Sequence, residues 1–202
     1  FSPYSSSFSV SYALLSGTNV RRNTRLQLRW AADRDVWQSS GSRINLSLAL
    51  SAWRYGHDLS EFSWGHGGYY SPRSYLSLAL PIEWSGRKGA LTWLVRGALS
   101  ASRSSSAASH FFPNNPALQG QASDLGSQPV YLGGRSTGLG RSFRGVVEYD
   151  TSRQLTLGAQ LELDRSAYYA PTSLLFYVRY RFDPVLAAPE NRPRPVQTYS
   201  SF

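Results

Sequence analysis

The sequence contains no cysteine and no methionine in 202 residues, and Lys88 is its single lysine. Without cysteine the chain can form neither a disulfide framework nor a thiolate metal site, and thiol catalysis is excluded. No other residue pattern points to a metal ion or a cofactor. We therefore expect a protein that works without a metal or a cofactor and carries its positive charge almost entirely on arginine.

Long hydrophobic runs are also absent. A transmembrane helix needs about 20 consecutive apolar residues, whereas the longest apolar segment, Ile44–Ala52, is interrupted by Asn45, Ser47 and Ser51. The chain starts with Phe1 and shows no signal peptide. We therefore expect it to be a processed or partly observed product of a longer precursor.

The net charge of +9, with a pI near 10.1, is compatible with nucleic-acid binding. The arginines, however, are dispersed along the chain rather than gathered in one patch, as at Arg21, Arg54, Arg96, Arg144 and Arg181. No basic helix, zinc-finger spacing or RNA-recognition motif accompanies them. A nucleic-acid partner is therefore not expected.

Apolar and polar residues alternate with a period of two in segments of about ten residues, which predicts β-strands. In Gln154–Asp164, Leu157 and Leu161 fall on one face, while Thr156 and Gln160 fall on the other. Eight segments follow this pattern: Ser7–Ser16, Thr24–Ala32, Arg43–Arg54, Tyr75–Ser85, Ala90–Ser102, Ser142–Asp150, Gln154–Asp164 and Ser173–Phe182. The sequence therefore predicts an all-β domain with one apolar face and one polar face.

Soluble antiparallel sandwiches alternate in the same way, so the strand lengths and connections decide between the two fold classes. The predicted strands have about 9–13 residues, close to what a tilted membrane crossing requires. Short connections at Gly86–Lys88 and Thr151–Arg153 alternate with long ones at Tyr55–Arg73 and Arg103–Arg141. Outer-membrane barrels have short periplasmic turns and long extracellular loops, so we predict a transmembrane outer-membrane antiparallel β-barrel.

Aromatic residues test this orientation. If the two short turns are periplasmic, six large aromatic residues fall near the periplasmic ends of their strands, namely Trp30, Trp84, Trp93, Tyr149, Tyr180 and Phe182. Such a girdle is typical of membrane barrels. We expect outward leucines such as Leu46, Leu48, Leu78, Leu80, Leu157 and Leu161 to face lipid.

Two regions complete the expected organisation. Residues 1–182 form the barrel part, and residues 183–202 form a tail with Pro184, Pro189, Pro193 and Pro195. Proline cannot donate to a ladder of hydrogen bonds, so the tail cannot continue the sheet. By the same orientation the tail should be extended and periplasmic.

The segment from Phe62 to Arg73, FSWGHGGYYSPR, leads into the strand Tyr75–Ile82, and the closing strand runs from Tyr169 to Phe182. These segments resemble the C-terminal barrel of the bacterial cellulose synthase outer-membrane subunit, the cellulose synthase operon protein C family. The glycine–aromatic motif is the more specific of the two, and the alternating pattern between them fits throughout.

The resemblance implies a sixteen-stranded barrel, preceded by a long periplasmic scaffold of helical (TPR) repeats. It implies a non-enzymatic channel that exports cellulose, a β-1,4-glucan, across the outer membrane of a Gram-negative cell. The implied partners are the glucan polymer, outer-membrane lipids and, through the helical repeats, the cellulose synthase complex of the inner membrane. This chain holds only about eight strands, the C-terminal half of such a barrel, and no helical repeat.

The inward positions support an incomplete barrel. An eight-stranded barrel has an interior just wide enough to be filled by side chains. Many inward residues here are small, among them Ser47, Ala49, Ser77, Ala79 and Ser100. They would leave such an interior poorly filled, so we expect a wider lumen completed by further strands.

Aromatic side chains at inward or loop positions could stack on sugar rings, or they could simply pack the loop into the barrel mouth. They are Trp53, Tyr55, Trp64, Tyr69, Tyr70, Tyr75 and Tyr177. Between them lie Gly65, His66, Gly67 and Gly68, whose glycines allow backbone conformations that other residues avoid. With Arg103–Arg141, this loop is expected to form an adjustable outer gate.

Inward charged residues are expected to form ion-pair ladders across neighbouring strands. The candidates are Glu83, Arg96, Arg144, Glu148, Glu162, Asp164, Arg179 and Arg181. A wall of this kind is hydrophilic and binds no sugar tightly, which a path for a moving polymer requires.

Two other functions stay open. A porin for another exopolysaccharide or for small solutes would share the same barrel. An outer-membrane barrel hydrolase would need a catalytic group, and His57, Asp58 and Ser63 invite that interpretation. Neighbours in sequence rarely form a triad, and no oxyanion-hole motif is visible, so no catalytic residue is assigned.

Overall fold

A computed structural model describes residues 4–126, 128–166, 170–182 and 192–194. These residues are almost entirely β-structure. The elements are β1 (Ser5–Gly17), β2 (Val20–Gln38), β3 (Ser42–Tyr55), β4 (Ser74–Lys88), β5 (Leu91–Ser105), β6 (Ser109–His110), α1 (Pro116–Asp124), β7 (Val130–Tyr131), β8 (Arg135–Asp150), β9 (Leu155–Arg165) and β10 (Thr172–Tyr180). In this described part, no helix has the length and hydrophobicity needed to span a membrane.

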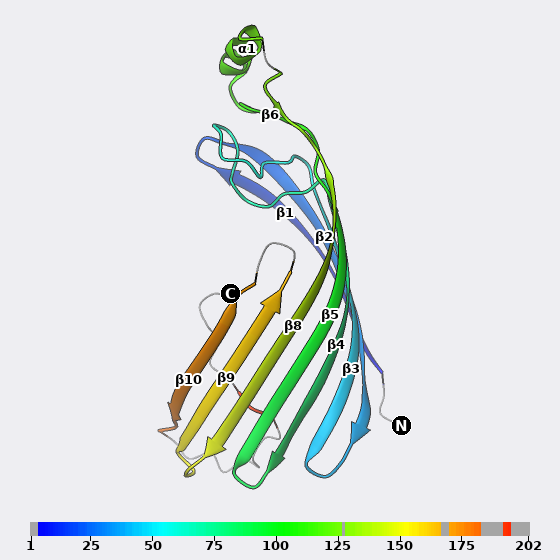
Figure 1. Ribbon diagram of the computed structural model, residues 1–202, viewed down its shortest axis with the longest axis vertical. Helices are drawn as coiled ribbons and strands as arrows, with labels where there is room; N and C mark the ends of the chain where they lie inside the picture. Colours follow the sequence, from blue (N-terminus) through cyan, green and yellow to red (C-terminus); the bar gives the residue numbers. More distant parts are fainter. Residues whose placement is uncertain (1–3, 127, 167–169, 183–191, 195–202) are drawn as a thin grey trace.

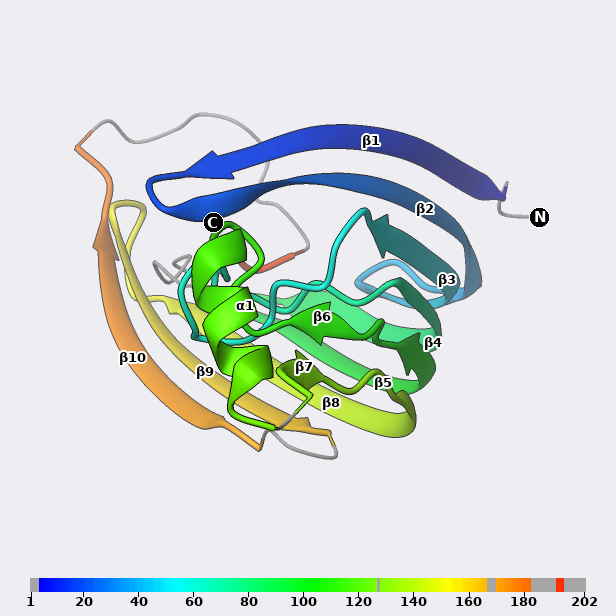
Figure 2. The same ribbon diagram turned by 90° about the horizontal axis from the view of Figure 1, so that it is seen from above.

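Eight of the strands form one sheet in the order β1-β2-β3-β4-β5-β8-β9-β10, and every neighbouring pair is antiparallel. The sheet curves strongly, so that it has a convex face and a concave face (Figures 1 and 2). Within the described residues β1 and β10 are its two edges, and no ladder joins them. The predicted all-β antiparallel sheet is confirmed, and its closure into a barrel stays a prediction.

The strands extend beyond the predicted limits. β2 continues to Gln38 rather than ending near Ala32, through the charged residues Asp33, Arg34 and Asp35, and Val36 has no partner and forms a bulge. A bulge adds one residue to one strand and interrupts the alternation. β8 starts at Arg135, well before Ser142, within the segment that was predicted to be a loop.

The short connections between β2 and β3, β4 and β5, and β8 and β9 lie at one end of the sheet, whereas the two-residue turn between β1 and β2 lies at the other (Figure 1). The turn predicted at Gly86–Lys88 is displaced: these residues belong to β4, and the chain turns at Gly89, whose φ is +61°. The turn at residues 151–154 agrees with the prediction. At the opposite end the connections at residues 56–73 and 106–134 are long.

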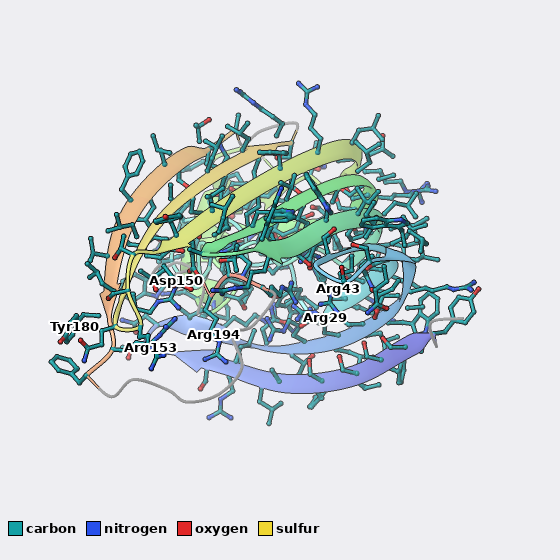
Figure 3. All side chains as sticks on the ribbon, turned by 90° about the horizontal axis from the view of Figure 1, so that it is seen from below. Arg29, Arg43, Asp150, Arg153, Tyr180 and Arg194 are labelled. Carbon is teal, nitrogen blue, oxygen red and sulfur yellow. The ribbon has the colours of Figure 1, made fainter. Side chains whose placement is uncertain are left out.

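The two faces of the sheet have opposite polarity. Apolar side chains on the convex face are exposed, for example Leu80 at 53% and Phe176 at 72%. Polar side chains on the concave face are buried, for example Thr156 at 0% and Gln160 at 3%. Figure 3 shows Arg29, Arg43 and Asp150 inside the curve of the sheet and Tyr180 outside it. This polarity is the reverse of that of a water-soluble protein.

The predicted aromatic band occupies the short-turn end of the convex face. Trp84 and Trp93 are neighbours with ring centroids 5.5 Å apart, Tyr180 lies 5.2 Å from Phe182, and Tyr149 pairs with Leu91 at the end of β5. The prediction for Trp30 is wrong. Trp30 pairs with Leu50 in the middle of β3 because β2 runs on past the bulge. Trp37, which pairs with Ile44, lies at this end instead.

The long connection between β5 and β8 contains structure that the sequence did not predict. Strands β6 and β7 pair in a two-stranded sheet, and α1 lies beyond them at the far end of the molecule (Figure 1). The side chain of Asn115 caps α1 by accepting a hydrogen bond from the Leu118 amide at 3.0 Å. This helix is polar and has no buried residue, so alternation gave no indication of it.

Candidate functional site

The connection between β3 and β4, residues 56–73, folds into a compact loop. Leu59 is its hydrophobic centre and is 1% exposed. The Leu59 amide donates to Ser71 Oγ at 2.7 Å, and Ser60 Oγ donates to Asp58 Oδ1 at 2.6 Å. Because its backbone groups are paired internally, the loop has a defined shape although it contains little regular secondary structure.

Strand β2 anchors this loop. The side-chain amide of Asn23 donates to the His57 carbonyl at 2.8 Å and to Tyr69 Oη at 3.0 Å, and its oxygen accepts from the His57 amide at 2.9 Å. The Arg21 amide donates to the Gly65 carbonyl at 2.8 Å. Burial of the phenol raises the pKa of Tyr69. Asn23 is 3% exposed, and the sequence analysis overlooked it because its role depends on a partner 34 residues away.

The glycines of the motif serve two purposes. Gly65 and Gly68 have φ values of +98° and +65°, a region that favours glycine. Gly67 does not need this conformation. A Cβ at Gly67 would overlap the ring of Tyr69, so glycine there makes room for the aromatic side chain.

The two long connections touch each other. His66 is 6% exposed, and its Nε2 lies 2.9 Å from the His110 carbonyl oxygen. Its ring meets the edge of Tyr131 at 5.5 Å, and Ser63 Oγ donates to the Phe111 carbonyl at 2.6 Å. The loop and the hairpin of β6 and β7 therefore form one unit, which we call the cap (residues 56–73 and 106–134).

The same contacts give no support to a catalytic triad. Ser63 bonds to the backbone of the hairpin, and Asp58 bonds to Ser60. Desolvation, with Arg21 and Arg73 nearby, lowers the pKa of His57. Among the described residues no group of three His, Cys, Asp or Glu could hold a metal ion.

The aromatic candidates divide into separate groups. Trp53 and Tyr75 stack with ring centroids 3.9 Å apart and planes 9° apart, and Tyr70 meets Tyr75 edge-on at 6.3 Å. Tyr55 is buried and packs against Tyr69 at 5.9 Å. Trp64, by contrast, is 54% exposed. Trp53, Tyr70 and Tyr75 therefore form a cluster, which we call the aromatic cluster, where the cap joins β3 and β4.

Tyr177 belongs to a different environment, at the opposite end of the concave face. It donates a hydrogen bond to Glu148 Oε1 at 2.7 Å, and Arg179 forms an ion pair with the same carboxylate. Glu148 is on β8 and Tyr177 is on β10, so these contacts cross β9. They cross it at Gly158, which pairs with both residues in register.

The charge ladder exists in part. Arg144 pairs with Glu162 at 3.1 Å, directly across the ladder between β8 and β9, and bonds Gln160 at 3.2 Å. Arg96 stands opposite Glu83, yet the recorded ion pair of Glu83 is with Arg192 at 2.8 Å. Among the residues that the structure describes, neither Arg181 nor Asp164 has an ion-pair partner.

Further polar contacts of the concave face were not predicted. Asn45 donates to Asp33 at 3.2 Å and to Asp35 at 3.0 Å. Near the short turns, Arg87 forms an ion pair with Asp150 at 2.9 Å. The two aspartates of β2 lie beyond the predicted end of that strand, which explains why the periodicity missed them.

Most of the predicted tail lies outside the described residues, and its placement in the periplasm stays a prediction. The described triplet Arg192–Arg194 contacts the concave face. Arg192 reaches Glu83, the Arg194 amide donates to Glu148 Oε2 at 3.3 Å, and Pro193 is buried. Figure 3 shows Arg194 inside the curve of the sheet.

Comparison with protein families decides where the chain belongs. The family model described as the C-terminus of cellulose synthase operon protein C matches residues 3–183. The chain belongs to this family. The resemblance noted in the glycine–aromatic motif and the closing strand is thereby confirmed.

Several members of the operon protein C family are similar to the chain. The cellulose synthase 2 operon protein C of Komagataeibacter xylinus is 34% identical over 174 residues, which are 85% of this chain and 13% of that protein. The operon protein C of Salmonella typhimurium is 31% identical over 172 residues, covering 85% of this chain and 15% of that protein. The operon protein C of Xanthomonas axonopodis is 30% identical over 194 residues, covering 89% of this chain and 13% of that protein. The chain thus spans only a small part of the length of these relatives.

Proposed function

We propose that this domain forms part of an outer-membrane channel through which cellulose leaves a Gram-negative cell. Membership of the cellulose synthase operon protein C family supports a role in cellulose biosynthesis. The reversed polarity of the sheet supports a membrane location. The proposed function is transport without chemistry, in an accessory subunit rather than an enzyme.

The apolar convex face is the main support for this proposal. Its exposed apolar residues extend over all eight strands of the sheet, from Phe8 on β1 to Val178 on β10. Soluble monomers rarely expose contiguous apolar patches larger than a few hundred Å². The strands of the sheet have 9 to 19 residues, and a tilted membrane strand needs about 9–11. Lipid is the solvent that suits such a face.

The two free edges of the sheet require partners in a membrane. Unpaired backbone N–H and C=O groups cost several kcal/mol each in hydrocarbon, so β1 and β10 cannot remain edges there. We propose that further strands of a longer protein pair with them and complete the sixteen-stranded barrel implied by the family. The inner-membrane synthase complex would then be reached through the periplasmic helical repeats.

The concave face suits a moving polymer. Several of its carboxylates and arginines are paired with one another, as in Arg144–Glu162 and Arg179–Glu148, so they offer a sugar hydroxyl many weak contacts rather than one strong one. Conduction requires sites that are weak enough to leave. We assign the aromatic cluster of Trp53, Tyr70 and Tyr75 as the place where glucan rings stack below the cap.

Ion-current recordings on the full-length protein in planar bilayers test the proposal. Cello-oligosaccharides added to one side should interrupt the current more often than malto-oligosaccharides of equal length, because the flat β-1,4 chain matches a stacked aromatic surface. Absence of any channel contradicts the proposed function. Equal interruption by both sugars contradicts cellulose as the transported polymer.

A further inference from the structure

The convex face carries a group of arginines toward the end of the sheet that bears the long connections. Arg141 of β8 stands directly across from Arg165, the last residue of β9, and both side chains are exposed. On its other side Arg141 pairs with Leu99 of β5, which is 67% exposed. Residues directly opposite each other in an antiparallel ladder share a face. Both guanidinium groups therefore lie on the convex face, beside the apolar side chains that we place in lipid.

A second pair of arginines lies farther from the short turns on the same face. Arg103 of β5 pairs with Leu76 of β4, which is 51% exposed. Arg135 of β8 lies two residues beyond Thr137, the partner of Arg103 in the ladder. Such diagonal neighbours are within reach of each other when their side chains are long. We call Arg103, Arg135, Arg141 and Arg165 the arginine patch.

The arginine patch has no counterion of its own. Within the described part of the chain, none of its four arginines forms an ion pair. Strand β5 has no acidic residue, and those of β8 and β9 all alternate onto the concave face, namely Glu148, Asp150, Glu162 and Asp164. Like charges directly opposite each other destabilise a ladder. The pair Arg141–Arg165 is therefore unfavourable unless an anion lies between the two guanidinium groups.

The depth of the patch matches a membrane boundary. Arg141 lies eight residues along β8 from Tyr149 of the aromatic band. At about 3.3 Å per residue and a strand tilt of about 40°, this separation is about 20 Å along the membrane normal. The apolar band of outer-membrane barrels is about 25 Å tall. Arg141 and Arg165 thus lie near its outer boundary, and Arg103 and Arg135 lie beyond it.

We propose that the arginine patch binds the phosphate groups of lipopolysaccharide, the anionic glycolipid of the outer leaflet of the outer membrane. This inference rests on the proposed function, which places the domain in that membrane. A guanidinium group binds phosphate oxygens through two parallel hydrogen bonds, and Arg141 and Arg165 hold one phosphate between them. Phe143 and Leu163, which are paired one step nearer the membrane centre, contact the acyl chains.

A binding titration tests the patch. Fluorescently labelled lipid A, the phosphorylated part of lipopolysaccharide, is added to the full-length protein in detergent. The double variant Arg141→Gln with Arg165→Gln should raise the Kd by about tenfold or more, because two charged contacts with a phosphate are lost. The control is Arg54→Gln with Lys88→Gln, which removes the same charge from exposed convex positions outside the patch and should keep the affinity near wild type. Equal affinities of the two double variants refute the site.

Unlabelled competitors identify the ligand. Lipid A should displace the labelled lipid, whereas dephosphorylated lipid A, phosphatidylglycerol and inorganic phosphate should displace it poorly. Displacement by dephosphorylated lipid A to the same extent would show that phosphate is not recognised. Equal displacement by inorganic phosphate or by phosphatidylglycerol would show a general anion site, and either result contradicts a site for the glycolipid.

Thermal unfolding, followed by heat-modifiable gel mobility, separates this inference from the proposed function. Without lipid A, Arg141→Gln should raise the unfolding temperature, because it relieves the repulsion between Arg141 and Arg165. With lipid A, the wild-type protein should gain more stability than the variant. Failure of the wild-type protein to insert into liposomes contradicts the proposed membrane location. If it inserts but lipid A stabilises the wild-type protein and the variant equally, only the phosphate site is refuted.

Discussion

The phenol of Tyr177 lies across Gly158 of the neighbouring strand and donates its hydrogen bond to Glu148 one strand further on, at 2.7 Å. A Cβ on Gly158 would overlap the Tyr177 ring. The absence of a side chain at Gly158 is therefore what allows β8 and β10 to interact across β9. A glycine in a strand interior often marks such a close approach.

Replacing Gly158 by alanine should destabilise the barrel by roughly 1–3 kcal/mol, the usual cost of overpacking a well-packed site. Gly97→Ala is the matched control, because a Cβ at that glycine of β5 meets only ordinary contacts at 3.9 Å and 4.0 Å. Urea unfolding of the full-length protein in detergent, followed by tryptophan fluorescence, measures both. The Tyr177→Ala background should remove most of the Gly158→Ala penalty; an undiminished penalty would show that Tyr177 is not its cause.

Arginine on the convex face should be costly in proportion to its depth. Leu80→Arg, at the middle of β4, should make folding into lipid less favourable by about 2–4 kcal/mol. Leu91→Arg, at the short-turn end of β5, should destabilise the protein by only about 0–1 kcal/mol. Ala79→Arg, one residue away on the concave face, is the control and should be tolerated better. Folding titrations into liposomes measure the three values, and equal costs at Leu80 and Ala79 would contradict the assignment of the faces.

The strands and their faces were predictable because alternation is a local property of the sequence, as in β9. Three kinds of feature could not be predicted from the sequence. The charged run Asp33–Asp35 of β2 has no alternation of apolar and polar residues, so the strand was predicted to end before these two aspartates. Helix α1 is polar on all sides, so it lacks an apolar stripe. The pairing of Arg192 with Glu83 joins residues 109 positions apart, and no local pattern can indicate such a contact.

The glycine–aromatic motif was recognised from its composition, but the different role of each of its glycines became visible only in the structure. The sequence indicated that Gly65, Gly67 and Gly68 give the loop conformational freedom. Only two of them have a positive φ, and the third makes room for Tyr69. The anchor Asn23 was missed because nothing in its own strand distinguishes it from a solvent-facing amide.

Deletion of Trp64–Tyr70 should raise single-channel conductance while leaving barrel assembly intact, because the deletion removes Gly65 and Tyr69, which contact β2, and His66, which contacts the hairpin. Phe62→Ala, at a side chain of the same loop that is 89% exposed, should leave the conductance unchanged. Planar-bilayer recordings give the conductance, and heat-modifiable gel mobility reports assembly. Unchanged conductance after the deletion would mean that the cap lies outside the pore.

The chain by itself should fail to form a heat-resistant and protease-resistant monomer when it is refolded in detergent, since the N–H and C=O groups along β1 and β10 would stay unpaired. Gel mobility with and without heating checks this expectation, with a full-length relative as the positive control. A stable eight-stranded monomer would contradict both the need for further strands and the wide lumen.

The central claim is that the apolar convex face meets lipid while the polar concave face lines water. Spin labels at Leu78 and Leu80, and at Ser77 and Ala79 on the opposite face of the same strand, test it in the full-length protein reconstituted into liposomes. We predict that oxygen dissolved in lipid relaxes the labels at Leu78 and Leu80, and that a water-soluble nickel complex relaxes those at Ser77 and Ala79. Nickel accessibility at Leu78 and Leu80 with none at Ser77 and Ala79 would contradict the channel.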